Sequence, residues 1–223
     1  VMHPEGWLKR VAQAVRASGA LLIADEVMTG FGRTGEVFAG RKEKVVPDFL
    51  CLAKGLTGGY LPMAATLTTQ PVYNAFLGEY EEFKTFFHGH SYTGNQLGAA
   101  AALASWELLH QPKAKVRRRA MERVLARELD SLWALAAVGD VRREGLVAGV
   151  ELVADWKTRR AFALKDRAGI RVCEAMARRG VLTRPIGNVI PLLPPYCTTD
   201  AQLRRMVRVL RESITEVLGA GQV

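Results

Sequence analysis

Cysteine is scarce in this sequence, and its spacing excludes two kinds of small, cross-linked protein. The 223 residues contain three cysteines, Cys51, Cys173 and Cys197, which are far apart and odd in number. They match neither a disulfide framework nor the closely spaced pairs of a zinc site. We therefore expect three reduced cysteines that lie in a protein core.

Long apolar runs are also missing. No run approaches the roughly 20 residues that a helix needs to cross a bilayer, and the first residues show no signal-peptide pattern. We therefore expect a cytoplasmic protein with no membrane partner. Because Val1 is not an initiator methionine, we also expect the chain to be the C-terminal part of a longer protein.

Positive charge is the one excess in an otherwise ordinary globular composition, with 49% hydrophobic and 24% charged residues. The net charge of +9 comes largely from clusters such as Lys113–Arg119 and Arg204-Arg205. Such clusters could bind nucleic acid or could be the solvated faces of helices. They lie on predicted helices without interleaved aromatic residues, which favours solvated faces, and we expect no nucleic-acid partner.

The order of the predicted elements indicates an α/β protein. Ala20–Ala24 is an apolar run without polar alternation, which predicts a strand buried on both faces, as in a parallel sheet. We expect residues 1–112 to be part of a large domain with a mostly parallel sheet and helices. Residues 113–137 would form a connecting helix, and residues 138–223 a small α+β C-terminal domain. Thr199 or Asp200 can cap the last helix of that domain.

Two residues that follow predicted strands suggest a site. Asp25 ends the first strand, and Lys54 follows the strand Asp48–Leu52 and precedes several glycines. A lysine at such a turn is a candidate for a desolvated amine that attacks carbonyl groups. Neighbouring strands could bring the acid and the amine to one edge of a sheet. That pair suits pyridoxal phosphate, which needs a lysine Schiff base and an acid on its pyridine nitrogen.

The run Gly30–Gly35 has the spacing G-x-G-x-x-G of a dinucleotide fingerprint. That fingerprint also requires a long helix that opens on the glycines. The following residues, Glu36–Lys42, are short and broken by glycine, so we favour a flexible loop close to a ligand.

The run His88–Asn95 combines two histidines with small hydroxyl side chains on a flexible backbone. A metal site is one interpretation, but no carboxylate or cysteine nearby completes a ligand set. Hydroxyls and free N–H groups before a helix suit a phosphate better. Arg184, which precedes Pro185, could be a surface residue or could bind a substrate carboxylate by a bidentate pair.

Together, these segments resemble the class III, fold-type I, pyridoxal-phosphate aminotransferases. The resemblance is carried by Leu21–Gly35 and Pro47–Gly59 and covers nearly all of the chain. It implies a homodimer with shared active sites. It also implies that Lys54 carries the cofactor and moves a proton, that Asp25 pairs with the pyridine nitrogen, and that Val27 packs on the ring.

Further roles are implied by the same resemblance. Ser91 would donate to the cofactor phosphate across a homodimer interface, and His90 would contribute through its backbone. Arg184 would bind the substrate carboxylate, and Arg33 would lie near the substrate. The family has a long N-terminal half that supplies a phosphate-binding turn and a ring-stacking tyrosine. Because that half is absent here, we expect the 223 residues alone to be inactive and to hold the cofactor poorly.

Within the class, three runs resemble the branch that acts in biotin biosynthesis: Thr66–Thr69, His88–Gln96 and Arg184–Asn188. This implies transamination of 8-amino-7-oxononanoate to 7,8-diaminononanoate, with S-adenosylmethionine or lysine as the amino donor. Two alternatives stay open. One is a class III aminotransferase for an ω-amino acid, ornithine or a diamine, and the other is a nucleic-acid-binding or scaffold protein that uses the positive charge.

Overall fold

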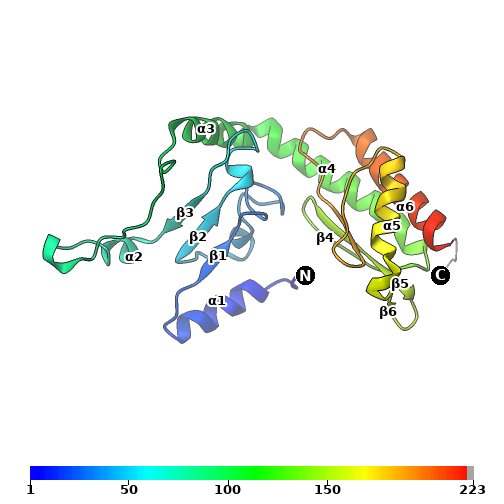
Figure 1. Cartoon of the computed structure of the whole chain (residues 1–223), viewed down its shortest axis with the longest axis horizontal. Helices are drawn as coiled ribbons and strands as arrows, with labels where there is room; N and C mark the ends of the chain where they lie inside the picture. Colours follow the sequence, from blue (N-terminus) through cyan, green and yellow to red (C-terminus); the bar gives the residue numbers. More distant parts are fainter. Residues whose placement is uncertain (220–223) are drawn as a thin grey trace. The chain divides into compact units, whose positions relative to one another are not determined.

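A computed structural model describes residues 1–219 of the chain, which form two compact units (Figure 1). Unit 1 comprises residues 3–115, and unit 2 begins at Val116. Each unit mixes helices and strands, so the expectation of an α/β protein is confirmed at this level. Among residues 1–219, no helix combines the length and the apolar character needed to span a bilayer.

Unit 1 contains a three-stranded sheet in the order β1-β2-β3 (Figure 1). β1 (Ile23–Asp25) is parallel to β2 (Phe49–Leu52), and β3 (Ala65–Thr68) is antiparallel to β2. The sheet therefore has one pairing of each kind, where the sequence predicted mostly parallel strands. Asp48 fixes the start of the parallel pair, because its Oδ2 accepts a hydrogen bond of 2.7 Å from the N–H of Leu22.

The prediction that the first strand is buried on both faces is wrong for the described chain. Ile23 is 65% exposed, and Leu67 on β3 is 53% exposed. The reason is that the principal helix contacts within unit 1 are with 3₁₀ turns and not with the strands. Ile23 shares one face of the sheet with Phe49, and Leu67 shares the other face with Leu50, so each face has an exposed apolar side chain.

The helices of unit 1 are α1 (Trp7–Ala17), α2 (Gln70–Asn74) and α3 (Gln96–His110). α1 follows a glycine that has no side chain to cap the helix. The carboxylate of Glu43 caps it instead, accepting hydrogen bonds of 2.8 Å and 2.6 Å from the N–H groups of Gly6 and Lys9. This cap comes from η1 (Ala39–Glu43), so a distant residue holds α1 in unit 1.

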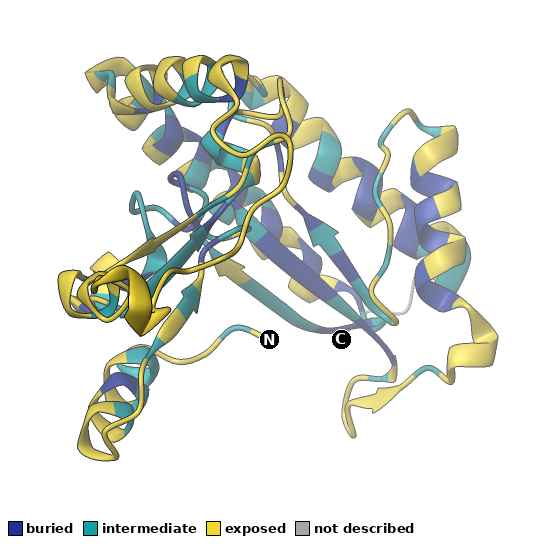
Figure 2. Cartoon of the chain, turned by 60° about the vertical axis from the view of Figure 1, so that its left-hand side comes forward, coloured by how far each residue is buried: buried dark blue, intermediate teal, exposed yellow. Residues whose placement is uncertain are grey.

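The segment between α2 and α3 is exposed over its whole length, from residue 73 to residue 97 (Figure 2). It contains the short 3₁₀ helix η3 (Tyr80–Glu82) and is otherwise irregular, as the glycines of its second half predicted. The rings of Phe76 and Phe86 lie 5.1 Å apart between centroids, so the segment packs partly against itself.

Unit 2 contains an antiparallel sheet with β5 at its centre. β5 (Val147–Asp155) pairs with β4 (Val138–Glu144) along one edge and with β7 (Val189–Leu192) along the other. β6 (Arg160–Ala161) pairs with the end of β5. The helices of this unit are α4 (Pro112–Asp130), which begins at the end of unit 1, α5 (Ala168–Arg178) and α6 (Asp200–Leu218). The remaining short turns are η4 (Ser131–Ala134) and η5 (Leu164–Asp166).

The core of unit 2 is continuous, and its buried side chains come from every long element (Figure 2). Fully buried examples are Met121 of α4, Val150 of β5, Ile190 of β7 and Leu210 of α6. The N-cap of α6 is Thr199, one of the two residues that the sequence predicted for this role. Its Oγ1 accepts from the N–H of Gln202 at 3.2 Å, and the Gln202 side chain accepts from the N–H of Thr199 at 2.8 Å.

The cysteines match the expectation only in part. All three are free thiols, and Cys173 on α5 is buried. Cys51 is half-buried, and Cys197 is exposed because it lies in the turn that follows Tyr196. The prediction of a core residue is therefore wrong for Cys197.

Candidate active site

Asp25 and Lys54 come from the same edge of the unit 1 sheet. In the parallel pair, Ile23 lies opposite Phe49 and Asp25 lies opposite Cys51. Asp25 is the last residue of β1, and Lys54 begins η2 (Lys54–Leu56), two residues after β2 ends. The carboxyl ends of neighbouring parallel strands are the usual place for a ligand in an α/β sheet. The register thus places Asp25 and Lys54 at the carboxyl ends of adjacent parallel strands, the edge at which the sequence predicted them.

Lys54 has a left-handed backbone, with φ 48°. A side chain other than glycine in this region costs roughly 1–2 kcal/mol, so neighbouring groups must stabilise it. The amine was predicted to be desolvated, yet Lys54 is exposed in the described chain.

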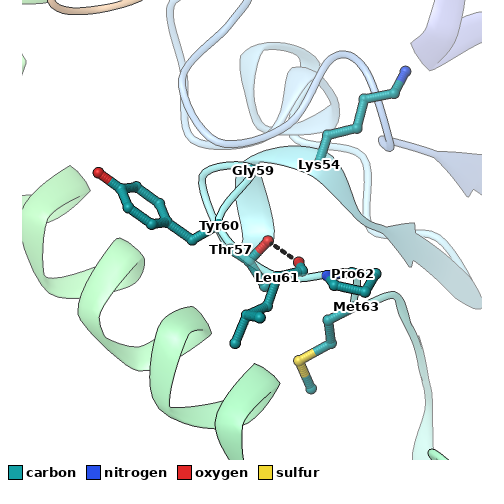
Figure 3. Close-up of a pocket in the computed structure, with 7 residues that line it drawn as sticks. All are labelled: Lys54, Thr57, Gly59, Tyr60, Leu61, Pro62 and Met63. Atoms are coloured by element: carbon teal, nitrogen blue, oxygen red, sulfur yellow. Dashed lines mark hydrogen bonds between the residues drawn. The ribbon is translucent and has the colours of Figure 1, made fainter.

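A cavity of about 380 Å³ lies beside Lys54 and opens to solvent (Figure 3). Its lining is a single stretch of chain: Lys54, Thr57, Gly59, Tyr60, Leu61, Pro62 and Met63. Thr57 is buried and ties the stretch together, because its Oγ1 donates a hydrogen bond of 2.6 Å to the carbonyl of Leu61. In Figure 3 the Lys54 side chain points away from the Tyr60 ring.

The loop after β1 is held by a buried acid that no sequence pattern had indicated. Glu26 is only 4% exposed, and its carboxylate accepts three hydrogen bonds. The donors are the hydroxyl of Thr29 at 2.6 Å and the N–H groups of Ala39 and Gly40 at 2.9 Å each. Three donors satisfy a buried carboxylate and close the ends of the loop on each other. Asp25 is exposed next to it, and its Oδ1 accepts from the N–H of Val27 at 3.0 Å.

Within this loop, Phe31 contacts the turn that contains Lys54. Phe31 is buried and has a left-handed backbone, with φ 57°. A Cβ added to Gly55 would lie 2.7–2.8 Å from the Cβ, Cγ and Cδ2 atoms of Phe31, so only glycine leaves room for the ring. On α3, Ser105 Oγ donates a hydrogen bond of 2.9 Å to the carbonyl of Gly55. Sequence analysis missed these residues, because the contacts join positions up to 50 residues apart.

The glycine pattern from Gly30 to Gly35 forms a loop, as predicted. Gly32 and Gly35 both have positive φ, and the next helical element is the five-residue 3₁₀ helix η1. The long helix of a dinucleotide-binding fingerprint is therefore not present, which rules that alternative out. Arg33 is half-buried in this loop, in the same unit as Lys54.

His90 and Ser91 lie in the exposed segment between α2 and α3. The N–H of His90 donates to Thr93 Oγ1 at 3.0 Å, and the N–H of Tyr92 donates to His90 Nδ1 at 3.1 Å. These bonds shape a tight turn around Ser91. Within residues 1–219, no hydrogen bond or ring contact joins this turn to Asp25 or Lys54, and no cluster of three potential metal ligands occurs.

Arg184 belongs to unit 2. It lies in the stretch before β7, between the half-buried Thr183 and Pro185. Thr183 anchors that stretch, because its Oγ1 donates a hydrogen bond of 2.8 Å to the carbonyl of Pro191. The Arg184 side chain is exposed and accessible to a ligand.

The chain belongs to the class III aminotransferases. The model of this family, described as "Aminotransferase class-III", matches residues 1–214. Class III aminotransferases depend on pyridoxal phosphate, so the expectation for the cofactor is confirmed at the level of the family.

Individual relatives of the chain share one more specific enzyme name. The chain is 49% identical to an adenosylmethionine-8-amino-7-oxononanoate aminotransferase of Anoxybacillus flavithermus, over 96% of this chain and 48% of that protein. It is 47% identical to the enzyme of the same name from Geobacter sulfurreducens, over 98% and 48% of the two chains. The crystal structure of that enzyme from Methanocaldococcus jannaschii superposes with a TM-score of 0.94 at 44% identity. The match covers 97% of this chain and 50% of that one. The chain thus spans about half the length of the relatives it matches.

Proposed function

We propose that the protein to which this chain belongs transfers an amino group to 8-amino-7-oxononanoate to form 7,8-diaminononanoate, using pyridoxal phosphate. S-adenosylmethionine or lysine would be the amino donor. The observation that carries the proposal is the register of β1 and β2, which delivers Asp25 and Lys54 to one edge of the sheet. Relatives at 40–49% identity that bear the name of this enzyme support the choice of substrate.

The residues present match the needs of the cofactor. Lys54 offers an exposed primary amine and Asp25 an exposed carboxylate, and Lys54 is one of the residues that line an open cavity. When bound, pyridoxal phosphate supplies an electron sink that stabilises negative charge at the substrate carbon. Lys54 Nζ would hold the cofactor and would move a proton to and from that carbon. The Asp25 carboxylate would keep a proton on the pyridine nitrogen, and Val27 would pack against the ring.

The remaining roles concern the phosphate and the substrate. Ser91 would donate its hydroxyl to the phosphate of a second subunit's site, with the backbone of His90 beside it, so the protein would be a homodimer. Arg184 would form a bidentate pair with the substrate carboxylate, and Arg33 would lie near the substrate. The exposure of Ser91 and Arg184 supports these roles, because both side chains are accessible.

The domain organisation follows from the same proposal. Residues 1–112 would be part of the large cofactor-binding domain, 113–137 a connecting helix, and 138–223 the small C-terminal domain. The observed helix α4 (Pro112–Asp130) supports the connection. The protein would act in the cytoplasm on small molecules, without nucleic acid or membrane as partner.

A second class III activity remains a candidate, because solved structures of other transaminases also resemble the chain. An amine transaminase from an uncultivated Pseudomonas species has a TM-score of 0.89 at 35% identity, over 97% of this chain and 49% of that one. Such enzymes would share Asp25 and Lys54, so the substrate distinguishes the two proposals. Turnover of 8-amino-7-oxononanoate should far exceed turnover of 4-aminobutyrate by the native-length protein.

The chemistry at Lys54 is tested by trapping. The native-length protein is mixed with pyridoxal phosphate, reduced with borohydride and digested, and the peptide that carries the added mass is identified by mass spectrometry. We expect the mass on Lys54 and its loss in Lys54→Ala. Lys44→Ala is the matched control, because Lys44 is also exposed and left-handed, with φ 55°. Label on another lysine, with Lys54→Ala fully active, would refute the proposal.

A further inference from the structure

Lys54 must keep an unfavourable backbone conformation and still present its amine in one place. Its φ of 48° is left-handed, and its own side chain is exposed. Beyond the hydrogen bonds within its own turn, the next residue, Gly55, is contacted by two other parts of unit 1.

Gly55 is held from two directions by unit 1. Phe31 packs against its Cα, with three ring-side atoms 2.7–2.8 Å from where a Cβ would stand. Ser105 of α3 donates to its carbonyl at 2.9 Å. One contact comes from the loop after β1 and the other from a helix 50 residues further along the chain.

The Phe31 contact is itself fixed by the buried acid Glu26. The three hydrogen bonds to its carboxylate close the loop that presents Phe31. Phe31 also packs edge-on against Phe38, with centroids 5.8 Å apart, and Phe38 stacks on Trp106 of α3 at 6.4 Å. The loop and the helix that hold Gly55 are thus packed against each other by aromatic rings.

We propose that Ser105 and Phe31, the latter held by Glu26, are positioning residues that clamp the Gly55 peptide and thereby fix the backbone of Lys54 for catalysis. The inference rests on the proposed function of Lys54. Reacting groups need alignment to within a fraction of an ångström, and a displacement of about 1 Å can cost on the order of 100-fold in rate. The clamp would supply that alignment through the peptide of Gly55.

The first test removes the Ser105 hydroxyl in the native-length protein. Ser105→Ala should lower kcat about tenfold, the effect of losing one hydrogen bond that positions a reacting group, with a KM within about twofold. The pH at which the absorbance of the bound cofactor changes should shift, and Ser105→Thr should restore both properties. Ser18→Ala is the matched control, because Ser18 Oγ also donates to a backbone carbonyl in unit 1, at 2.8 Å from Val15.

A second readout needs neither cofactor nor activity. The N–H groups of Leu56 and Thr57 donate within the η2 turn, to Ala53 at 3.0 Å and to Lys54 at 3.3 Å. In cofactor-free protein, Ser105→Ala should speed hydrogen exchange at these two amides about tenfold, and Ser18→Ala should not. Equal exchange and equal kcat in Ser105→Ala and Ser18→Ala would overturn the clamp.

If Ser105→Ala fails to fold, Gly55→Ala decides the question. Its added Cβ would displace Phe31 and should both speed exchange in η2 and lower kcat, whereas adding Phe31→Gly removes the clash and should recover part of the exchange protection. No difference between these two variants would contradict the inference. If no cofactor attaches to Lys54 in the parent protein, the proposed function fails, and the exchange comparison still decides the clamp.

Discussion

The two units differ in how fully they bury their apolar side chains: unit 2 has a continuous buried core, whereas unit 1 contains Asp25 and Lys54 on a partly exposed sheet. Leu210 and Ile190 of unit 2 are fully buried, whereas Ile23 and Leu67 of the unit 1 sheet are more than half exposed. The strands of unit 1 are as apolar as those of unit 2, so the difference lies in what covers them. An apolar pattern shows that a strand can be buried, but tertiary packing decides whether the described chain buries it.

Two aspartates with the same local geometry, one in each unit, should differ most in their effect on activity. Asp25 ends β1 and accepts from the N–H of Val27 at 3.0 Å; Asp155 ends β5 and accepts from the N–H of Lys157 at 2.9 Å. In the native-length protein, Asp25→Asn should lower kcat by at least about 100-fold, because the amide cannot hold a proton on the pyridine nitrogen. Asp155→Asn should leave steady-state kinetics unchanged. Similar losses in both variants would remove the distinction between the units.

The second comparison concerns stability. Leu210→Ala in unit 2 should lower the free energy of unfolding of the 223-residue chain by about 2–5 kcal/mol, since Leu210 is fully buried. Leu67→Ala in unit 1 should change it by less than about 0.5 kcal/mol, because Leu67 is 53% exposed. Urea unfolding followed by circular dichroism measures both. A large effect of Leu67→Ala would show that its strand face is covered.

The three cysteines should react with a thiol reagent at different rates, according to their burial. Burial, with a smaller contribution from Glu174, raises the pKa of Cys173 to about 11. At pH 8 only about one molecule in a thousand carries that thiolate, so Cys173 should react with a thiol reagent at least about 100-fold more slowly than the exposed Cys197. The half-buried Cys51 of unit 1 should fall between them. Raising the pH should speed labelling of Cys173 about tenfold per unit until the pH approaches 11. Rapid labelling at pH 8 would contradict this account.

Helix caps provide a smaller contrast. Thr199→Ala removes a local cap and should destabilise α6 by about 1 kcal/mol. Glu43→Gln weakens a cap that reaches α1 from 34 residues further along the chain, so it should also loosen η1. Hydrogen exchange distinguishes the two: protection should fall only in α6 for the first variant, and in both α1 and η1 for the second. Loss confined to α1 would show that η1 is held independently.

The smallest expected effect concerns exposed ion pairs. Hydrogen bonds from Arg179 and Arg178 lower the pKa of Glu216 below 4.5. A depressed pKa stabilises the fold above the unfolded-state pKa, and the contribution is lost as pH falls through the folded value. Glu216→Gln should therefore lower the melting temperature slightly at pH 7, because the pair joins α5 to α6, and the difference should shrink as the pH falls. Lys84 likewise lowers the pKa of Glu82 in unit 1. Both residues lie in one exposed turn, so Glu82→Gln should leave the melting temperature unchanged.

How much could be predicted depended on how far apart the contacting residues lie in the sequence. Asp25 and Lys54 could be found because each follows an apolar strand, and the Thr199 cap because its partner is three residues away. Ser105 could not, since its bond to Gly55 spans 50 residues. β4 was missed because the polar run Asp140–Glu144 hides its alternation, and the exposure of Cys197 depends on a turn that spacing does not reveal.

The strand register has a consequence for how such a chain can change in evolution. Asp25 lies opposite Cys51, so the acid and the amine are brought together by the short path from Cys51 to Lys54. The longer path through residues 26–48 does not set the strand register, although the loop at its start places Phe31 against Gly55. Insertions at exposed positions there, such as near Lys42 or Lys44, could accumulate without moving the two groups apart. A single residue gained or lost between Cys51 and Lys54 would turn the lysine toward a different side.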